Sequence, residues 1–364
     1  MSNTQRSKLE KIKRGTVSAF GEKAAALGSE KIKLNVVPTP SLMLDYKLGI
    51  GGFPYGAMVE VFGGNGLGKT TVLGYGVLAN VQREGKLPAL IAMEPYFDKD
   101  WALKLHGLDP DLILIQYPDN VQEAFDMLWD LVFNTEIDYI LVDSIGAMGN
   151  ESSQKEGGKK KAYGVSGEVT SGLNDIMPRL YKSNKGLMIV NQQRQTGAFN
   201  GTTLYESPGG EALKHHASIR IQLKPGSGRF KATIDGEKDV LVGRELKCLF
   251  KKNKLAQAAN KSAEFNFFHI ETPEWGLGID KPSDVLNAGQ VSGAIKSAGN
   301  WLQHPAFPKG KVNGKAQAAA FLREHPEAYE PIREDVIRSM VEQEIELEQE
   351  KNAKVIQLPV ANDG

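Results

Sequence analysis

Short apolar runs alternate with longer amphipathic stretches through the middle of the chain. The apolar runs lie at residues 58–62, 88–93, 112–115, 139–142 and 186–190. The stretches that repeat apolar positions at helical spacing lie at residues 69–84, 98–106, 121–133 and 170–183. Apolar strands that alternate with helices are typical of an α/β fold with a mainly parallel sheet and helices on both faces. Residues 217–250 supply the strands that we expect to complete this sheet.

The pattern changes towards both ends, and the chain divides into four expected parts. Residues 1–30 form a charged helix and a small-residue segment, an N-terminal helical arm that is too short to fold alone and should dock on this core or on another copy. Residues 31–269 form the core, in which a short helix is expected to begin after Ser41 as its N-cap. Short helical pieces among Trp, Gly and Pro residues predict a small separate α/β domain at 270–340, and residues 341–364 a glutamate-rich flexible tail.

The first apolar run leads directly into a glycine-rich motif. Residues 63–70 fit the pattern G-x-x-x-x-G-K-[ST] of a phosphate-binding loop. The glycines let backbone N–H groups close around phosphate oxygens, Lys69 reaches the terminal phosphates, and the Thr70 hydroxyl ligates Mg²⁺. A chance match is disfavoured because a strand precedes the motif and an apolar helix follows it. We therefore expect ATP and Mg²⁺ to bind at Gly63, Gly64, Asn65, Gly66, Leu67, Gly68, Lys69, Thr70 and Thr71.

Acidic residues at the ends of two further strands extend this site. Asp143 follows the apolar run 139–142; alone it would more often be a turn residue, but beside a phosphate-binding loop it is expected to hold Mg²⁺ together with Thr70. Glu94 closes the run 88–93, where it would either polarise the attacking water or remain a solvated loop acid. Trp101 lies one helical turn beyond Asp98, and we assign both to the ATP site, with core packing as the alternative for the tryptophan.

Polar segments follow the strands at the same expected sheet edge. Gln192 ends the run at 186–190 and could sense the terminal phosphate, moving the polar residues 193–210 as a switch. That segment lacks apolar periodicity, so it is either a nucleic-acid-binding loop or a disordered surface loop. A run of three lysines (159–161) suits phosphate contact, although such runs are usually solvated surface. The DNA-binding residues expected in these segments are Lys159, Lys160, Lys161, Arg194, Thr196, Phe199, Gly209 and Gly210.

Composition limits the alternatives. The 364 residues carry a formal net charge of zero, so any nucleic-acid contact must depend on local patches. The single cysteine, Cys248, excludes an internal disulfide and suits a reducing compartment. No signal peptide is visible, and no apolar run approaches the length of a membrane span. We expect a cytoplasmic protein without a membrane partner.

Several separated segments resemble the RecA-type homologous recombinases. The similar segments, in the family's order, are residues 41–56, the phosphate-binding loop, 191–194, 209–220, 252–256 and 276–280. The resemblance covers about residues 31–340 and implies a RecA-like P-loop ATPase core. It also implies an ATP-dependent recombinase that forms a helical filament on single-stranded DNA and exchanges strands with homologous double-stranded DNA.

The resemblance also assigns catalytic roles that the residues alone leave open. It implies that Glu94 activates water beside Lys69, and that Gln192 couples the nucleotide state to the DNA loop. From the residues alone, Lys252 and Lys254 could either contact phosphate or lie in an exposed turn. The resemblance implies that both reach the ATP of the neighbouring subunit. Hydrolysis would then require the filament. The arm at 1–30 would dock on the next protomer, the domain at 270–340 would help to capture duplex DNA, and the glutamate-rich tail would moderate access.

The chain departs from the bacterial pattern at four places. Asn65 stands in place of a glutamate, residues 93–98 in place of Asp-Ala-Glu-His-Ala-Leu-Asp, the pair 215–216 (His-His) in place of an aromatic pair, and Pro178 in place of a DNA-contacting arginine. The resemblance implies that Trp101 takes the place of an adenine-stacking tyrosine. With Val165 and Ser166, it also assigns Arg179 to the DNA-binding set, where Arg179 and the lysines at 159–161 would compensate for the missing arginine. Two other functions are therefore weighed. One is a RecA-core ATPase that remodels DNA or protein without strand exchange, and the other is a DNA-coating filament protein with little hydrolysis.

Overall fold

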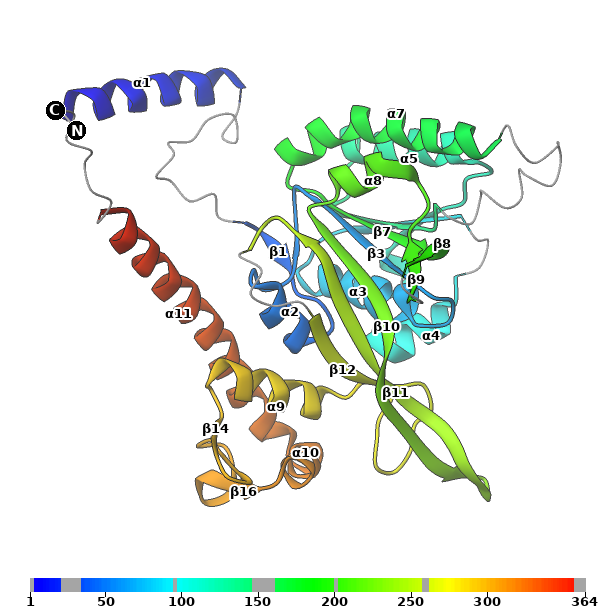
Figure 1. Ribbon diagram of the computed structural model, residues 1–364, viewed down its shortest axis with the longest axis vertical. Coiled ribbons are helices and arrows are strands. Elements are labelled where there is room, and N and C mark those ends of the chain that lie inside the picture. The colour runs from blue at the N-terminus through cyan, green and yellow to red at the C-terminus, as the bar shows by residue number, and fades with distance from the viewer. Residues whose placement is uncertain are drawn as a thin grey trace.

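The computed structural model describes residues 3–20, 34–93, 97–145, 161–199, 202–256 and 262–356 (Figure 1). Its centre is a nine-stranded sheet in the order β13-β12-β11-β10-β3-β7-β6-β4-β5. The strands are β3 (Met58–Gly63), β4 (Pro88–Ala92), β5 (Leu114–Gln116), β6 (Tyr139–Asp143), β7 (Gly186–Gln192), β10 (Ile219–Ile234), β11 (Glu237–Asn253), β12 (Ser262–Phe268) and β13 (Gly278–Ile279). Pairing is parallel from β10 to β5 and antiparallel from β10 to β13. The α/β fold is thus confirmed.

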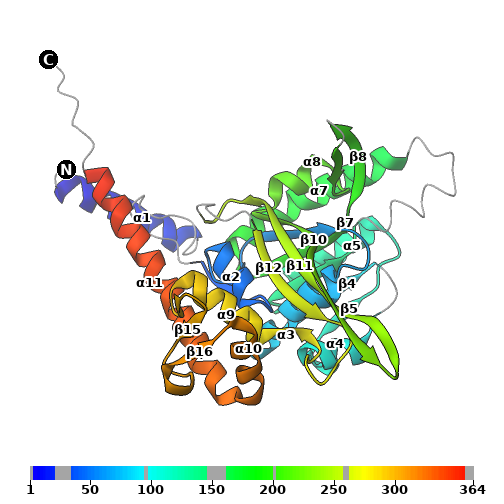
Figure 2. The same ribbon diagram turned by 60° about the horizontal axis from the view of Figure 1, so that its bottom comes forward.

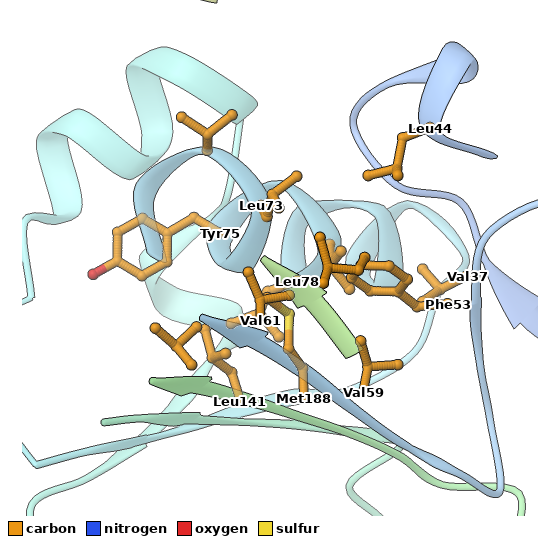
Figure 3. Close-up of a cluster of buried hydrophobic side chains, with 14 of the residues drawn as sticks. Val37, Leu44, Phe53, Val59, Val61, Leu73, Tyr75, Leu78, Leu141 and Met188 are labelled. Carbon is orange, nitrogen blue, oxygen red and sulfur yellow. The ribbon is translucent and has the colours of Figure 1, made fainter. Parts of the chain in front are cut away.

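Helices cover both faces of this sheet, as Figures 1 and 2 show. One face carries α2 (Leu42–Leu48), the π-helical turn η2 (Lys69–Gly74), α3 (Tyr75–Arg83) and α4 (Lys99–His106). The other carries α5 (Val121–Phe133), α7 (Lys161–Lys182) and α8 (Gly210–His216). Alternate residues of β3 enter the two cores: Val59 and Val61 pack with η2 and α3, whereas Met58 packs with α5 and α7. In Figure 3 the side chains of Leu73 and Leu78 face Val61 and Met188 across this first interface.

The termini of the core elements follow capping chemistry. Ser41 caps α2 as expected, because its side chain accepts a hydrogen bond from the Leu44 amide. Asn120 caps α5 in the same way through the Glu123 amide. Two glycines in left-handed conformation, Gly49 and Gly107, end α2 and α4. A strand pair, β1 (Val36–Val37) and β2 (Phe53–Pro54), flanks α2.

Three boundaries differ from the sequence-based expectation. The run 112–115 begins with a 3₁₀ turn, η3 (Pro110–Leu112), so β5 starts two residues late. Helix α7 begins at Lys161 rather than at 170, because Gly164 and Gly167 hide the helical pattern of its first turns. The polar segment after β7, expected as a loop, forms the hairpin β8 (Arg194–Phe199) and β9 (Thr202–Glu206).

The C-terminal part packs around a core of its own. Helices α9 (Lys281–Ser292), α10 (Lys315–Glu324) and α11 (Tyr329–Ile356) surround the small sheet β14 (Lys296–Ala298), β15 (Trp301–Gln303) and β16 (Lys311–Asn313). Two further 3₁₀ turns are η4 (Pro308–Gly310) and η5 (Pro326–Ala328), and α1 (Asn3–Phe20) lies at the other end of the chain. The backbone of α11 is helical through Ile356, so part of the expected tail at 341–364 is helix.

None of the helices in the described ranges is long and apolar enough to cross a bilayer.

Candidate functional site

The phosphate-binding loop leaves the central strand of the sheet at its carboxyl end. Gly63, the last residue of β3, lies so close to β10 that a Cβ atom there would approach the Leu223 carbonyl oxygen to 2.4 Å. Gly68 has a φ of +82°, and a Cβ atom would lie 2.4 Å from Val72 Cγ2. Only glycine suits both positions. Lys69 is buried, and its Nζ donates a hydrogen bond to the Gly64 carbonyl at 2.9 Å, across the loop where phosphate oxygens would bind.

Thr70 and Asp143 meet at this edge although 73 residues separate them. The Thr70 hydroxyl donates to Asp143 Oδ2 at 2.6 Å, and Asp143 ends β6, two strands away from β3 in the sheet. A hydroxyl and a carboxylate are hard oxygen donors of the kind that Mg²⁺ binds, directly or through water. The donor set therefore fits the predicted Mg²⁺ site.

The end of β7 joins the loop to the predicted DNA-binding hairpin. Gln192 is the register partner of Gly63, and the Gln193 amide donates to the Gly63 carbonyl at 3.1 Å. The Gln193 side chain in turn accepts from Gln222 of β10 at 3.2 Å. Hairpin β8–β9 starts at the next residue. Gln193, which is bonded to the phosphate-binding loop, is thus followed directly by the first residue of the hairpin.

The predicted base and water sites are only partly described. Glu94 lies outside the described residues. Asp98 caps α4, because its carboxylate accepts from the Trp101 amide at 2.9 Å. Trp101 is half-buried on the first turn of α4, a helix that packs on α3. Neither residue has a described contact with residues 63–71.

The predicted DNA-binding residues fall into two groups. Ser166 and Gly210 lie together: a Cβ atom on Gly210 would be 3.4 Å from Ser166 Cβ. Arg194 is exposed on β8. Arg179, by contrast, is thirteen residues along α7 from Ser166, about 20 Å away, where its guanidinium lies over the Phe133 ring.

The remaining predicted DNA-binding residues that the structure describes lie on α7, on β8 and before α8. Lys161 and Val165 lie on α7, Thr196 and Phe199 on β8, with side chains that are not described, and Gly209 precedes α8. Lys159 and Lys160 lie outside the described residues.

Lys252 and Lys254 lie away from the phosphate-binding loop of their own chain. In the sheet register, Lys252 of β11 lies opposite Arg220 of β10, which lies opposite Glu60 of β3. The Lys254 amide donates to the Ser218 carbonyl, and the Ser218 amide donates to the Met58 carbonyl, so Lys254 is level with the start of β3. Lys252 Nζ donates to the Lys214 and His215 carbonyls at 2.5 and 2.9 Å at the end of α8. Burial, with Lys254 nearby, lowers the pKa of Lys252 to about 8.

A buried ion pair that the sequence analysis did not identify links β3 to the hairpin. Arg220 Nε of β10 contacts Glu60 Oε2 of β3 at 2.5 Å, and both residues are buried. The same guanidinium donates to the Ser207 hydroxyl at 3.1 Å and lies 3.6 Å from Glu206 at the end of β9. The signal was present in the sequence, because single charged residues interrupt the apolar strands at 58–62 and 219–223.

Comparison with known proteins agrees with this geometry. A family model described as the RecA N-terminal domain matches residues 7–272. Protein RecA of Thermus aquaticus is 32% identical over 341 residues, which cover 93% of this chain and 95% of the relative. Protein RecA of Thermus thermophilus is 32% identical over 342 residues, with the same coverage, and that of an Arthrobacter species is 32% identical over 316 residues, 86% of this chain and 83% of the relative. The chain therefore belongs to the RecA family of recombinases.

Proposed function

We propose that this protein hydrolyses ATP in a DNA-dependent manner and uses the cycle to pair and exchange homologous strands within a filament on single-stranded DNA. The observation that carries the proposal is the direct connection between the phosphate-binding loop and the hairpin. Gly63 is in register with Gln192 and bonded to Gln193, and β8 begins at Arg194. Family membership supports ATP and DNA as ligands.

The chain's own residues would divide the work at the nucleotide. The loop amides and the Lys69 ammonium would hold the phosphates, and Thr70 with Asp143 would hold the metal ion. Mg²⁺, when bound, supplies positive charge that stabilises the developing negative charge on the phosphate oxygens. Glu94 would orient and deprotonate the attacking water, in line with its place after β4. Gln192 would report the state of the phosphates to the hairpin.

Two features support a site that is completed by a second copy. Lys252 and Lys254 lie towards the opposite edge of the sheet from residues 63–70, so they are poorly placed for their own chain's nucleotide. The lowered pKa of Lys252 indicates a cation held partly out of water. A head-to-tail stack of identical chains would bring one edge against the other, and such a contact propagates as a filament.

The test of this function is ATP turnover by the full chain with Mg²⁺, measured with and without single-stranded DNA. We expect strong stimulation by the DNA, and formation of a joint molecule with homologous duplex in the same buffer. Turnover that does not respond to DNA would overturn the proposal. Stimulated turnover without joint molecules would favour an ATPase that remodels DNA or protein. Filaments on DNA whose turnover is unchanged by Glu94→Gln would favour a coating protein with little hydrolysis.

The domain at 270–340 and the arm at 1–30 belong to the same proposal. The domain would capture duplex DNA, the residues beyond 340 would moderate access to it, and the arm would dock on the next protomer. A protein that acts on chromosomal DNA in this way would be cytoplasmic. Deletion of residues 1–30 should abolish filaments on DNA in electron micrographs while leaving nucleotide binding measurable.

A further inference from the structure

The helix that follows the phosphate-binding loop opens with a π-helical turn. In η2 the Tyr75 amide donates to the Thr70 carbonyl, a step of five residues instead of the usual four. Such turns disturb the regular pairing of backbone carbonyls, and they often mark functional positions. The next carbonyl along the chain, that of Thr71, receives a side-chain donor. His106, the last residue of α4, places Nε2 at 2.7 Å from the Thr71 oxygen.

The chemistry of this contact fixes the state of the imidazole. A carbonyl oxygen only accepts hydrogen bonds, so Nε2 must carry the proton. Burial lowers the pKa of His106 to about 4, with Arg83 of α3 and Lys281 of α9 as the charged groups that face it and add to the effect. The ring is therefore neutral near pH 7, with a single defined tautomer. A neutral, buried donor with one orientation is suited to positioning rather than to proton transfer.

Further contacts make α4 and the loop helix one unit. At one end of α4, the Phe97 ring meets the Tyr75 ring edge-on at 5.3 Å. At the other end, Arg83 of α3 donates to the His106 carbonyl. Gly76 allows the close approach of α3 to two neighbours, because a Cβ atom there would lie 2.7 Å from Pro40 Cγ and 3.1 Å from His106 Cε1. Figures 1 and 2 show α4 beside α3 beneath the sheet. These contacts join η2 and α3 to both ends of α4.

We propose that His106 is a positioning residue of the nucleotide site: by donating to the Thr71 carbonyl, it fixes α4, and with it Trp101, relative to Thr70 and Thr71. This inference rests on the proposed ATP site and adds a coupling between its two halves. The phosphate half is the loop at 63–71, and the base half is the first turn of α4, where Asp98 caps the helix that carries Trp101. If this hydrogen bond holds the two halves in place, its loss weakens the binding of ligands that span both halves more than the binding of ligands that fill only one.

The experiment compares two probes, of which one carries a nucleoside on its phosphates and the other does not. A slowly hydrolysed ATP analogue spans both halves, whereas inorganic tripolyphosphate occupies the phosphate half alone. Dissociation constants of both are measured by calorimetry on the full chain with Mg²⁺, for wild type, His106→Phe and His106→Gln. His106→Phe keeps a ring but has no donor, and His106→Gln restores an N–H near the same place. The matched control is His325→Phe, since His325 is an exposed histidine on the C-terminal side of α10 that contacts Glu327.

We expect His106→Phe to weaken binding of the analogue roughly fivefold relative to binding of tripolyphosphate, the effect of losing one hydrogen bond. His106→Gln should recover most of that preference, and His325→Phe should leave it unchanged. An unchanged preference in His106→Phe would overturn the inference, as would an equal loss in His106→Phe and His106→Gln. Should His106→Phe fail to fold, His106→Asn takes its place, because its shorter amide cannot reach the Thr71 oxygen. A wild-type protein that binds the analogue no better than tripolyphosphate would instead contradict the proposed ATP site.

Discussion

The contact between Thr70 and Asp143 defines the predicted Mg²⁺ site with two side chains. Each follows a buried strand, and parallel strands end at a common edge, so the strand pattern alone placed the two oxygens on the same side of the sheet. The 2.6 Å hydrogen bond brings them within the shell of one small ion. Asp143 supplies the negative charge of this pair, and Thr70 supplies a neutral oxygen.

Replacing Asp143 by Asn removes the negative charge but keeps the shape of the side chain. The amide oxygen can still accept from the Thr70 hydroxyl, so the fold should persist. We expect the Mg²⁺ concentration for half-maximal ATP turnover to rise about 10- to 100-fold, the range found when a metal site loses a supporting charge. Turnover as a function of Mg²⁺ concentration measures this shift. Asp130→Asn is the matched control, because Asp130 is an exposed aspartate of α5 that accepts a side-chain hydrogen bond from Asn134. An unchanged Mg²⁺ requirement in Asp143→Asn would contradict the assignment.

At the scale of elements, the Glu60–Arg220 pair joins three of them. The pair connects β3 to β10, and the same guanidinium contacts Ser207 and Glu206 at the end of β9. The strand before the phosphate-binding loop is therefore bonded to the end of β9, while Gln192 and Gln193 connect the loop to the start of β8. Because Arg194 pairs with Glu206, both connections lie at the open end of the hairpin. Both strands of the hairpin are thus held, at its open end, by residues that contact β3 or its loop.

Removing one partner of this ion pair should destabilise the core more than removing both charges. Arg220→Met leaves Glu60 as a buried charge without its partner, and we expect a loss of about 3–5 kcal/mol in unfolding free energy. Glu60→Gln combined with Arg220→Met removes both charges and should cost less than the single change. Urea unfolding of the two variants tests this order. Equal losses would mean that the charge on Glu60 is compensated elsewhere.

Element contacts also join the core to the C-terminal domain. The N-terminus of α2 lies against Asp284 of α9: the Ser41 hydroxyl and the Leu42 amide donate to its two oxygens at 2.8 and 2.6 Å. Burial raises the pKa of Asp284 from 3.8 to about 6, although these hydrogen bonds oppose the shift. The charged groups that face Asp284 are Asp280 and Asp45. Burial also raises the pKa of Asp45, which Arg333 opposes.

This shift predicts a pH dependence of stability with a defined sign. The folded protein holds the Asp284 proton more tightly than the unfolded chain does, so the contribution is complete below about pH 4 and is lost as the pH rises through about 6. Its upper bound is about 3 kcal/mol. The thermal midpoint of wild type minus that of Asp284→Asn should therefore fall between pH 4 and pH 7. A difference that stays constant or rises over this range would exclude the assigned shift.

The elements that the sequence predicted well are those with a buried face. Strand β3 and helix α5 were expected within one residue of their observed bounds, because burial requires apolar residues at fixed spacing. Hairpin β8–β9 was missed because its segment is polar and follows no apolar period. The Glu60–Arg220 pair and the His106–Thr71 bond were missed because each depends on which strands or helices become neighbours. Periodicity predicts an element and its buried face, whereas pairing is decided by the whole fold.

At the scale of the whole molecule, the two sheet edges carry different halves of the proposed catalytic set. Residues 63–70, Asp143 and Gln192 lie at the carboxyl edge. Lys254 lies level with Met58, five residues before Gly63 on β3 and about 17 Å along the strand. One chain alone would leave these lysines away from its nucleotide. The arrangement predicts that a working site is formed between copies.

Mixing two inactive variants tests this prediction. Lys69→Arg disables the phosphate-binding loop but keeps Lys252 and Lys254, whereas Lys252→Ala with Lys254→Ala keeps the loop but removes those lysines. Each variant alone should show little DNA-stimulated ATP turnover. In an equal mixture that assembles at random on single-stranded DNA, about a quarter of the contacts between copies would combine an intact loop with intact lysines, because the contact is head-to-tail. Turnover should therefore recover to about that fraction of wild type. If the lysines act on the nucleotide of their own chain, every site in the mixture remains defective and turnover stays at the level of the separate variants.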